Sequence, residues 1–337
     1  MQLNFIDMFS GIGGFRLGME NAGHRCLAFF EWDKFARKSY KAMHDTENEG
    51  EYHDVKQVSN EDLEHFRGRV DVICGGFPCQ AFSVAGRRGG FEDTRGTLFF
   101  DIARFASVIQ PKYLFLENVK GLLNHNKGET FRIILNTLDE LGYDVEWQVL
   151  NSKHFGVPQS RERVYIVGHL RGQRTGKVFP IGTGVGQTSA EIKIIAGKEN
   201  YRQSYRVYDD EGIVETLSTM QGGGRHPHVL IREATSIGYK QANVGDSINY
   251  SVPNSSTRRG RVGNGIANTL DTACNQATLL PEGRIRRLTP RECWRLQSFP
   301  DHLFDRAREV NSDAQLYKQA GNSVTVNVVS EIASRLT

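Results

Sequence analysis

A cysteine stands directly after a predicted buried strand, in the stretch GGFPCQAFS at residues 75–83. The preceding residues VDVIC (70–74) are apolar and predict a strand, so Cys79 should lie where that strand leaves the sheet. Ligands collect at the carboxyl ends of strands in open α/β sheets. The thiolate is a nucleophile when it is exposed in an electropositive setting, which makes Cys79 a candidate nucleophile. Cys74, inside the strand, is expected to be an inert core residue.

The loop after this cysteine, residues 85–96, is basic and rich in glycine. It contains Arg87, Arg88 and Arg95. A loop of this kind beside a nucleophile can close over a phosphate backbone. The alternative interpretation is an exposed, flexible loop that binds nothing.

Two further motifs place charged side chains near strand ends. LENV (116–119) ends a predicted strand, and a partly desolvated Glu117 there could exchange a proton with a bound base, or it could cap the following helix. In QSRERVY (159–165), Arg161 and Arg163 alternate and should point the same way along a strand. Two such arginines can clamp an anion or a carbonyl oxygen; the alternative is an edge strand with solvated charges.

A glycine-rich turn follows the first predicted strand, in DMFSGIGGF (7–15). Glycines between a strand and a helix let the backbone approach a nucleotide-like ligand. Glu31, twenty residues past Gly11, could accept the hydroxyls of a ribose, and Asp54 and Val55 follow a third strand. The spacing is not GxGxxG, so an adenosine-bearing cofactor is favoured over a dinucleotide. A tight turn without a ligand is the alternative.

The elements that position these motifs alternate between strand and helix. Strands are expected in 3–9, 27–31, 70–74, 112–118, 143–151 and 163–170, and helices in 14–23, 33–43, 96–110 and 128–142. This alternation predicts an α/β domain with a mixed, mostly parallel sheet and helices on both faces.

Composition is that of a globular protein, with 39% hydrophobic and 24% charged residues in 337. No apolar run approaches the roughly 18 residues that a membrane span needs, so we expect a soluble, intracellular protein. Five cysteines without CxxC or zinc spacing predict reduced thiols and no metal site. Between residues 171 and 298, 18 Lys and Arg stand against 11 Asp and Glu, whereas the rest of the chain has a net charge of −4. This asymmetry favours a polyanion-facing segment.

The segment after residue 172 changes in character, because 16 of the 35 glycines lie between residues 171 and 298. A domain boundary is expected near 172–185. The pattern Gly-Ile-x-x-Thr-Leu-x-Thr occurs twice, starting at Gly212 and at Gly265, and suggests two related loops or a chance match. A helix capped by Thr289 and a final amphipathic helix from Asn322 follow. The final helix should return to cover the first domain.

Taken in order, the motifs carry a family resemblance that covers nearly the whole chain. They are DMFSGIGGF, GGFPCQAFS, RGTLFFDIARF, LENVKGLL, FGVPQSRERVYIVG, RLTPRECWRLQSFPD and YKQAGNSVTVNVV. This order resembles the DNA (cytosine-5)-methyltransferase family of the bacterial and phage restriction–modification type. The variable stretch, 173–283, is where that family places its target-recognition region.

The resemblance implies a fold, a reaction and a cofactor. The fold would be the Rossmann-like methyltransferase sheet with a small, loop- and strand-rich target-recognition domain. The reaction would transfer a methyl group from S-adenosyl-L-methionine to carbon 5 of a cytosine in duplex DNA. Residues 1–175, completed by 312–337, would form the catalytic domain, and 176–311, with a hinge at 284–311, the target-recognition domain.

The resemblance also implies roles for individual residues. Cys79 would be the nucleophile, Glu117 the acid and Arg163 the partner of the base, with Arg161 nearby. The cofactor-binding residues would be Asp7, Phe9, Gly11, Ile12, Gly13, Gly14, Glu31, Trp32, Asp54, Val55, Pro78, Leu98, Asn322, Ser323 and Val324. The DNA-binding residues would be Gln80, Ser83, Arg87, Arg88, Arg95, Gln203, Arg206, Thr216, Leu217, Gly223, Arg225, Arg258, Arg259, Thr269 and Leu270.

Three readings of the function remain at this point. The first is a monomeric, cytoplasmic DNA methyltransferase of a bacterium or phage that protects DNA, alone or beside a cognate restriction endonuclease, at a short GC-containing, near-palindromic site. The second is a tRNA methyltransferase, which the long basic region and the continuation of PCQ by AFS disfavour. The third is a catalytically silent DNA-binding regulator, which the intact Cys79, Glu117 and Arg163 disfavour.

Overall fold

A computed structural model describes residues 1–78, 98–182, 229–252, 255, 257–281 and 283–337. The described helices are α1 (Gly14–Asn21), α2 (Lys34–Met43), α3 (Asn60–Glu64), α4 (Leu98–Ile109), α5 (Glu129–Glu140), α6 (Pro290–Arg295), α7 (Asp301–Val310), α8 (Asp313–Asn322) and α9 (Val326–Ala333). Short 3₁₀ segments are η1 (Val55–Gln57), η3 (Lys120–Gly128) and η4 (Ser152–His154).

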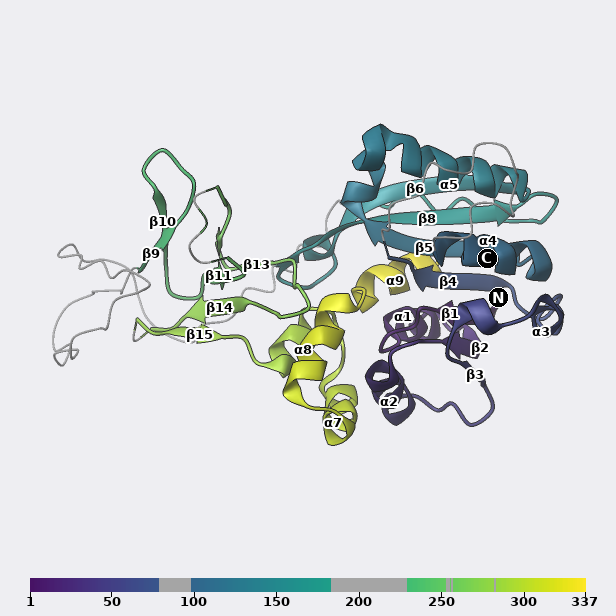
Figure 1. Cartoon of the computed structure of the whole chain (residues 1–337), viewed down its shortest axis with the longest axis horizontal. Coiled ribbons are helices and arrows are strands. Elements are labelled where there is room, and N and C mark those ends of the chain that lie inside the picture. Colours follow the sequence, from purple (N-terminus) through teal and green to yellow (C-terminus); the bar gives the residue numbers. More distant parts are fainter. Residues whose placement is uncertain (79–97, 183–228, 253–254, 256, 282) are drawn as a thin grey trace.

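The strands form one large sheet and several small ones (Figure 1). The large sheet contains β1 (Asn4–Met8), β2 (Arg25–Phe30), β3 (Gly50–Tyr52), β4 (Val72–Gly76), β5 (Tyr113–Val119), β6 (Tyr143–Asn151) and β8 (Glu162–Leu170). The small sheets contain β7 (Gln159–Ser160), β9 (Val229–Arg232), β10 (Tyr239–Ala242), β11 (Ser247–Asn249), β12 (Val262–Gly263), β13 (Ala267–Asn268), β14 (Gln276–Leu279) and β15 (Ile285–Arg287).

The large sheet has the strand order β3-β2-β1-β4-β5-β8-β6. β8 runs in the direction opposite to the other six strands, which all run the same way. The predicted mixed, mostly parallel sheet is therefore confirmed. The chain moves outward from β1 to β3 and then crosses back to β4, so β1 and β4 form a topological switch point. Ligands of open α/β sheets bind outside the carboxyl ends of the strands at such a point.

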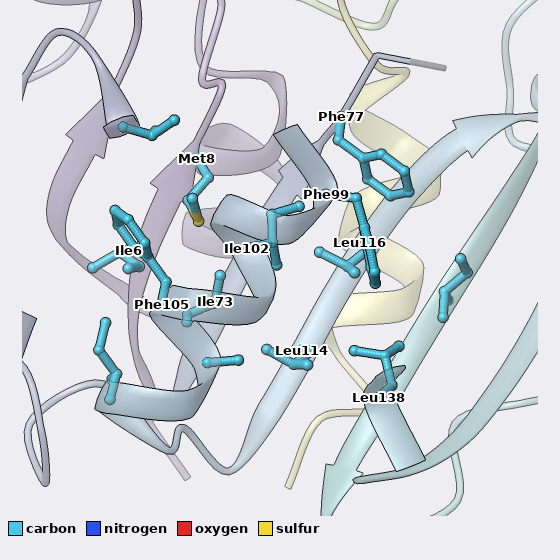
Figure 2. Packing of buried hydrophobic residues seen from close by; sticks show 14 of the residues in the cluster. Ile6, Met8, Ile73, Phe77, Phe99, Ile102, Phe105, Leu114, Leu116 and Leu138 are labelled. Atoms are coloured by element: carbon cyan, nitrogen blue, oxygen red, sulfur yellow. The ribbon is translucent and has the colours of Figure 1, made fainter. Parts of the chain in front are cut away.

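Two apolar layers sandwich the sheet, because successive residues of a strand face opposite sides. On one face, Ile6, Ile73 and Leu114 pack under α4, as Figure 2 shows. On the other face, Phe5 and Phe115 pack with α1 and α9. Residues at odd-numbered positions of β5 and β8 thus share the face of α1 and α9.

The last helix returns to the first domain, as predicted. Gly18 of α1 has no room for a Cβ atom, because one placed there would lie 2.5 Å from the side chain of Val329 on α9. The helix starts later than expected, since α8 ends at Asn322 and α9 begins at Val326. The predicted cap of α6 is confirmed: Thr289 and Glu292 form a reciprocal capping box ahead of Pro290.

The residues beside the predicted domain boundaries pack against helices of the large sheet. Val178, Phe179 and Ile181 are buried in the same cluster as residues of α1 and α9. Residues of α6 and α7 pack with Ile12 and Met43. Figure 1 shows the small strands β9–β15 gathered at one end of the molecule, apart from the large sheet.

Candidate active site

A buried ion pair stands at the carboxyl end of the large sheet. Glu117 near the end of β5 and Arg163 near the start of β8 lie on the same sheet face, and Arg163 Nε is 3.0 Å from Glu117 Oε1. Glu117 is 7% exposed, and its Oε1 has no partner with hydrogen-bond geometry among the described residues. Oε1 itself is inaccessible and faces Arg163, so only the remaining exposed surface of Glu117 is open to a ligand.

The surroundings of Glu117 favour its protonated form. Burial raises the pKa of Glu117, and the positive charges of Arg163 and Arg161 only partly oppose that shift. A Cβ atom at Gly76 would lie 3.0 Å from Glu117 Oε2, so glycine on β4 leaves space for this carboxyl group. Glu117 therefore lies at the sheet mouth with a pKa above its ordinary value.

The strand that leads to Cys79 is fixed to the same place. Asn118 donates from Nδ2 to the carbonyl oxygen of Phe77 at 2.8 Å, and Pro78 beyond it is exposed. Cys79 itself lies outside the described residues. Cys74 is fully buried in β4 with its Sγ 3.4 Å from the Ile6 carbonyl, as expected for a core residue.

Arg161 is buried and acts as a bridge. Its guanidinium donates to the carbonyl oxygens of Ser323 at 2.7 Å, Gly321 at 3.4 Å and Leu270 at 3.5 Å. Burial lowers its pKa to about 10, and the charge of Arg163 acts in the same direction. Arg161 thus joins the segment before α9 to the chain around Leu270. Its guanidinium bonds to backbone carbonyl oxygens, which indicates a structural role.

The glycine-rich turn after β1 is closed by Glu31. Its two carboxylate oxygens accept from the backbone N–H groups of Gly11 and Asp33, each at 2.7 Å. Gly13 has a φ of 81°, and a Cβ atom there would lie 2.4 Å from His44 Nε2. Only glycine fits this conformation and this space, so the tight turn needs its glycine independently of any ligand.

The other predicted cofactor residues surround this turn at the carboxyl ends of β1 to β4. Trp32 is 74% exposed, Asp54 caps η1 through the Lys56 N–H, and Val55 is buried in the core. Gly14 is in close contact with the C-terminal segment, because a Cβ atom there would lie 2.8 Å from Val324 and 2.9 Å from Ser323. The remaining members are the half-buried Phe9 and Leu98, the buried Ile12, and the exposed Pro78 and Asn322.

Asp7 is a correction to this group. It is fully buried on β1, with its Oδ2 3.4 Å from the hydroxyl of Tyr40 and its Oδ1 without a partner among the described residues. A side chain with no accessible surface cannot touch a cofactor directly. The motif DMFSGIGGF correctly predicts the glycine-rich turn, but the carboxyl group of Asp7 faces Tyr40 of α2.

The burial of Asp7 has a consequence for stability. Desolvation raises its pKa from 3.8 to about 8, so between these pH values the folded chain holds a proton that the unfolded chain has lost. The free energy of unfolding should therefore fall as pH rises from about 4 to 8. Asp7→Asn should remove this contribution, on the order of a few kcal/mol. Urea unfolding of the wild type and of Asp7→Asn at pH 5 and 8.5 measures this contribution. An identical pH dependence of the free energy of unfolding in the two proteins would refute the prediction.

The predicted DNA-binding residues fall into two groups. Arg258 and Arg259 are exposed in the small-strand region, and Arg259 Nε donates to the carbonyl oxygen of Ala234 at 2.7 Å. Thr269 is half-buried and donates to the Ser160 carbonyl. Outside the described residues lie Gln80, Ser83, Arg87, Arg88, Arg95, Gln203, Arg206, Thr216, Leu217, Gly223 and Arg225.

Leu270 is a second correction. It is 2% exposed and packs in the cluster of Trp294 and Ile12, so its side chain has no surface for a base. Its apolar character is explained by this burial.

From the sequence, Arg261 is expected beside Arg258 and Arg259 ahead of the second Thr-Leu pair, but Glu233 and the burial of both residues were missed. Glu233 is buried and accepts from the backbone N–H groups of Gly260, Arg261 and Val262. Arg261, also buried, donates to the carbonyl oxygens of Asn249 and Arg232. A lone Glu and one Arg in a basic run carry no periodic signal for burial.

No group of three or more His, Cys, Asp or Glu side chains in the described residues could hold a metal ion. No helix among them is both long and apolar enough to cross a membrane.

The strand order, the glycine-rich turn with its acidic partner, and the Glu–Arg pair at the sheet mouth define a methyltransferase of the S-adenosylmethionine-dependent fold. The profile of the C-5 cytosine-specific DNA methylases matches residues 3–337, so the chain belongs to that family and is a DNA (cytosine-5-)-methyltransferase.

Individual relatives agree with this assignment. The type II methyltransferase M.HpaII of Haemophilus parainfluenzae is 39% identical, over 99% of this chain and 89% of its own length. The type II methyltransferase M.HhaI of Haemophilus parahaemolyticus is 34% identical, over 98% and 93%. Among solved structures, the Dnmt2 methyltransferase of S. pombe matches with a TM-score of 0.56 at 18% identity, over 99% of this chain and 98% of that one, which supports the fold.

Proposed function

We propose that this chain methylates carbon 5 of a cytosine that is flipped out of a short, specific site in duplex DNA, through a covalent adduct between Cys79 and carbon 6. The observation that carries the proposal is the buried Glu117–Arg163 pair beside the exit of β4. The target carbon is inaccessible inside a duplex, so the base must leave the stack at a cost of roughly a few kcal/mol.

The proposed steps follow from the chemistry of cytosine. Carbon 5 is a poor nucleophile until the Cys79 thiolate adds to carbon 6, which makes carbon 5 enamine-like. The attack would otherwise build negative charge on N3 and O2 of the base. Glu117 in its protonated form donates its proton to N3, and Arg163 donates a hydrogen bond to O2, so this charge is stabilised. After methylation, Glu117 takes the proton back from N3, a base removes the carbon 5 proton, and elimination releases Cys79 as the thiolate.

The residues around the glycine-rich turn fit S-adenosylmethionine. The backbone approach at Gly11 to Gly14, the fixed carboxylate of Glu31 and the uncovered indole of Trp32 are complementary to an adenosine with a charged tail. When bound, this cofactor supplies an electrophilic methyl group on a sulfonium. Glu31 would hold the ribose, Trp32 would pack on the cofactor, and Asp54 with Val55 would contact the adenine. Asn322 to Val324 would close the site.

The biological role proposed is DNA protection. The relatives M.HpaII and M.HhaI are named type II methyltransferases, and others are named orphan methyltransferases of Bacillus phages. We propose a bacterial or phage enzyme that acts in the cytoplasm as a monomer. A cognate endonuclease would be a partner in function only.

Product analysis tests this function. The purified chain is incubated with methyl-labelled S-adenosylmethionine and either duplex DNA or tRNA, and the digested nucleosides are identified by mass spectrometry. Labelled 5-methyldeoxycytidine from DNA alone is expected. Label in tRNA only would transfer the proposal to RNA, and label in neither, with cofactor bound, would support a silent DNA-binding protein.

Arg259 should contribute to DNA binding from the small-strand region. Arg259→Ala removes an exposed guanidinium, and we expect weaker binding with a salt slope reduced by about 1 if it contacts a phosphate. A contact with a base edge would instead relax specificity by about 1–3 kcal/mol at one position. Salt-dependent binding isotherms measure both. Arg308→Ala, an exposed arginine on α7, is the charge-matched control. Unchanged kinetics on all sequences would remove Arg259 from the DNA-binding residues.

A further inference from the structure

A short strand that carries the second Thr-Leu pair is attached to the catalytic side of the molecule. Within the described residues, β13 (Ala267–Asn268) pairs in parallel with β7 (Gln159–Ser160), and not with β9–β12, β14 or β15. Figure 1 shows β13 on the side of the small strands that faces the large sheet. The backbone N–H of Ala267 also donates to the Pro158 carbonyl at 2.8 Å.

Gln159 is the central residue of this attachment. Its side chain is fully buried, its Oε1 accepts from the Leu270 N–H at 3.1 Å, and its Nε2 donates to the Leu296 carbonyl at 2.8 Å. One amide group thus ties the chain after β13 to the end of α6. The Thr269 hydroxyl adds a bond of 2.9 Å to the Ser160 carbonyl.

The same segment continues directly into the active site. Arg163 follows Gln159 by four residues and forms the ion pair with Glu117. The position of Thr269 relative to Glu117 is therefore set by one short stretch of chain, with Gln159 anchored at its start. A buried amide with both of its groups satisfied holds its partners in one geometry.

We propose that Gln159 is a positioning residue for sequence specificity, which fixes the distance between the bases read near Thr269 and the cytosine that reacts at Glu117. This inference rests on the proposed function. An enzyme discriminates through differences in kcat/KM, so contacts at the correct site must bring the target base into line with the reacting groups. Loosening the strand should lower kcat/KM at the correct site more than at mismatched sites.

Gln159→Met tests this, because methionine fills a similar volume without either hydrogen bond. The methylated motif is first read from DNA treated with the wild-type protein. Then kcat/KM is measured on duplexes with that motif and with each single mismatch. We expect the ratio of correct to mismatched kcat/KM to fall about tenfold or more, with the Kd for S-adenosylhomocysteine within twofold of wild type.

Gln297→Met is the matched control. Gln297 is also fully buried and also makes two side-chain bonds, donating to the Ala320 carbonyl at 2.9 Å and accepting from the Thr325 hydroxyl at 2.8 Å. Both partners belong to the C-terminal segment around 322–324. This variant should therefore lose a similar amount of stability and bind S-adenosylhomocysteine more weakly, while keeping its discrimination.

The outcomes separate the inference from the proposed function. The inference is overturned if Gln159→Met and Gln297→Met discriminate equally, or if the ratio of correct to mismatched kcat/KM is unchanged in Gln159→Met. DNA methylation by the wild type would still support the proposed function in either case. A wild-type protein that methylates no DNA would overturn both. Should Gln159→Met fail to fold, Gln159→Glu keeps the size and the acceptor for the Leu270 N–H, and an unchanged ratio in that variant would equally refute the role.

Discussion

Cys79→Ala should abolish methyl transfer, with a loss of at least about 10⁴-fold in kcat, because no step can proceed without addition at carbon 6. DNA and S-adenosylhomocysteine should still bind, since neither interaction requires the thiol to react. The chain leading to residue 79 is anchored by a hydrogen bond from Asn118 to the Phe77 carbonyl, which the substitution does not remove. Rates come from transfer of labelled methyl groups into DNA, and binding from a gel-shift titration.

A second cysteine provides the control for this prediction. Cys74 lies five residues earlier in β4, is fully buried and has a pKa raised by that burial. Cys74→Ala should cost stability but retain catalysis. Methylation by Cys79→Ala within tenfold of wild type would rule out the covalent route, and loss of activity in both variants would point to folding instead.

Glu117→Gln should lower kcat by about 10²–10⁴-fold, the usual contribution of a general acid. The amide can still donate a hydrogen bond to N3 but cannot deliver a proton. Arg163 would lose its ionic partner yet keep a polar neighbour, so cofactor affinity should change less than twofold. Single-turnover methylation of a saturating duplex measures the chemical step.

Glu146→Gln is the matched control for this effect. Glu146 on β6 is paired with His169 at 2.9 Å and accepts from the N–H groups of Val178 and Phe179. The same substitution there should affect stability and leave the chemical step unchanged. A single-turnover rate of Glu117→Gln equal to that of Glu146→Gln would exclude proton donation by Glu117.

The fold was predictable because its signals are local and repeated. Short, continuous apolar strands such as β5 alternate with amphipathic helices such as α5, and that alternation is typical of a mostly parallel sheet. The glycine-rich turn was also predictable, since a short loop between strand and helix has few solutions. The start of α9 was misplaced because Val324 fits the apolar spacing of the helix, although the backbone at Ser323 and Thr325 is extended between two helices.

The exposure of individual side chains could not be predicted from the sequence. Asp7 and Leu270 sit inside matching motifs, yet both are buried, because a motif identifies a position along the chain and not the surface that surrounds it. Nothing in the sequence around Gln159, a single amide before two arginines, predicts that it is buried and hydrogen-bonded. Its importance arises from partners 111 and 137 residues away, Leu270 and Leu296, and only the folded chain brings these together.

The most direct test of the central claim is the cytosine methylation pattern that the chain produces in cells. It is expressed in bacteria that lack cytosine methylation, and their genome is sequenced after bisulfite conversion. Our account predicts protected cytosines confined to one short motif, and full conversion in cells that express Cys79→Ala. A fully converted genome in cells that hold soluble wild-type protein would contradict it.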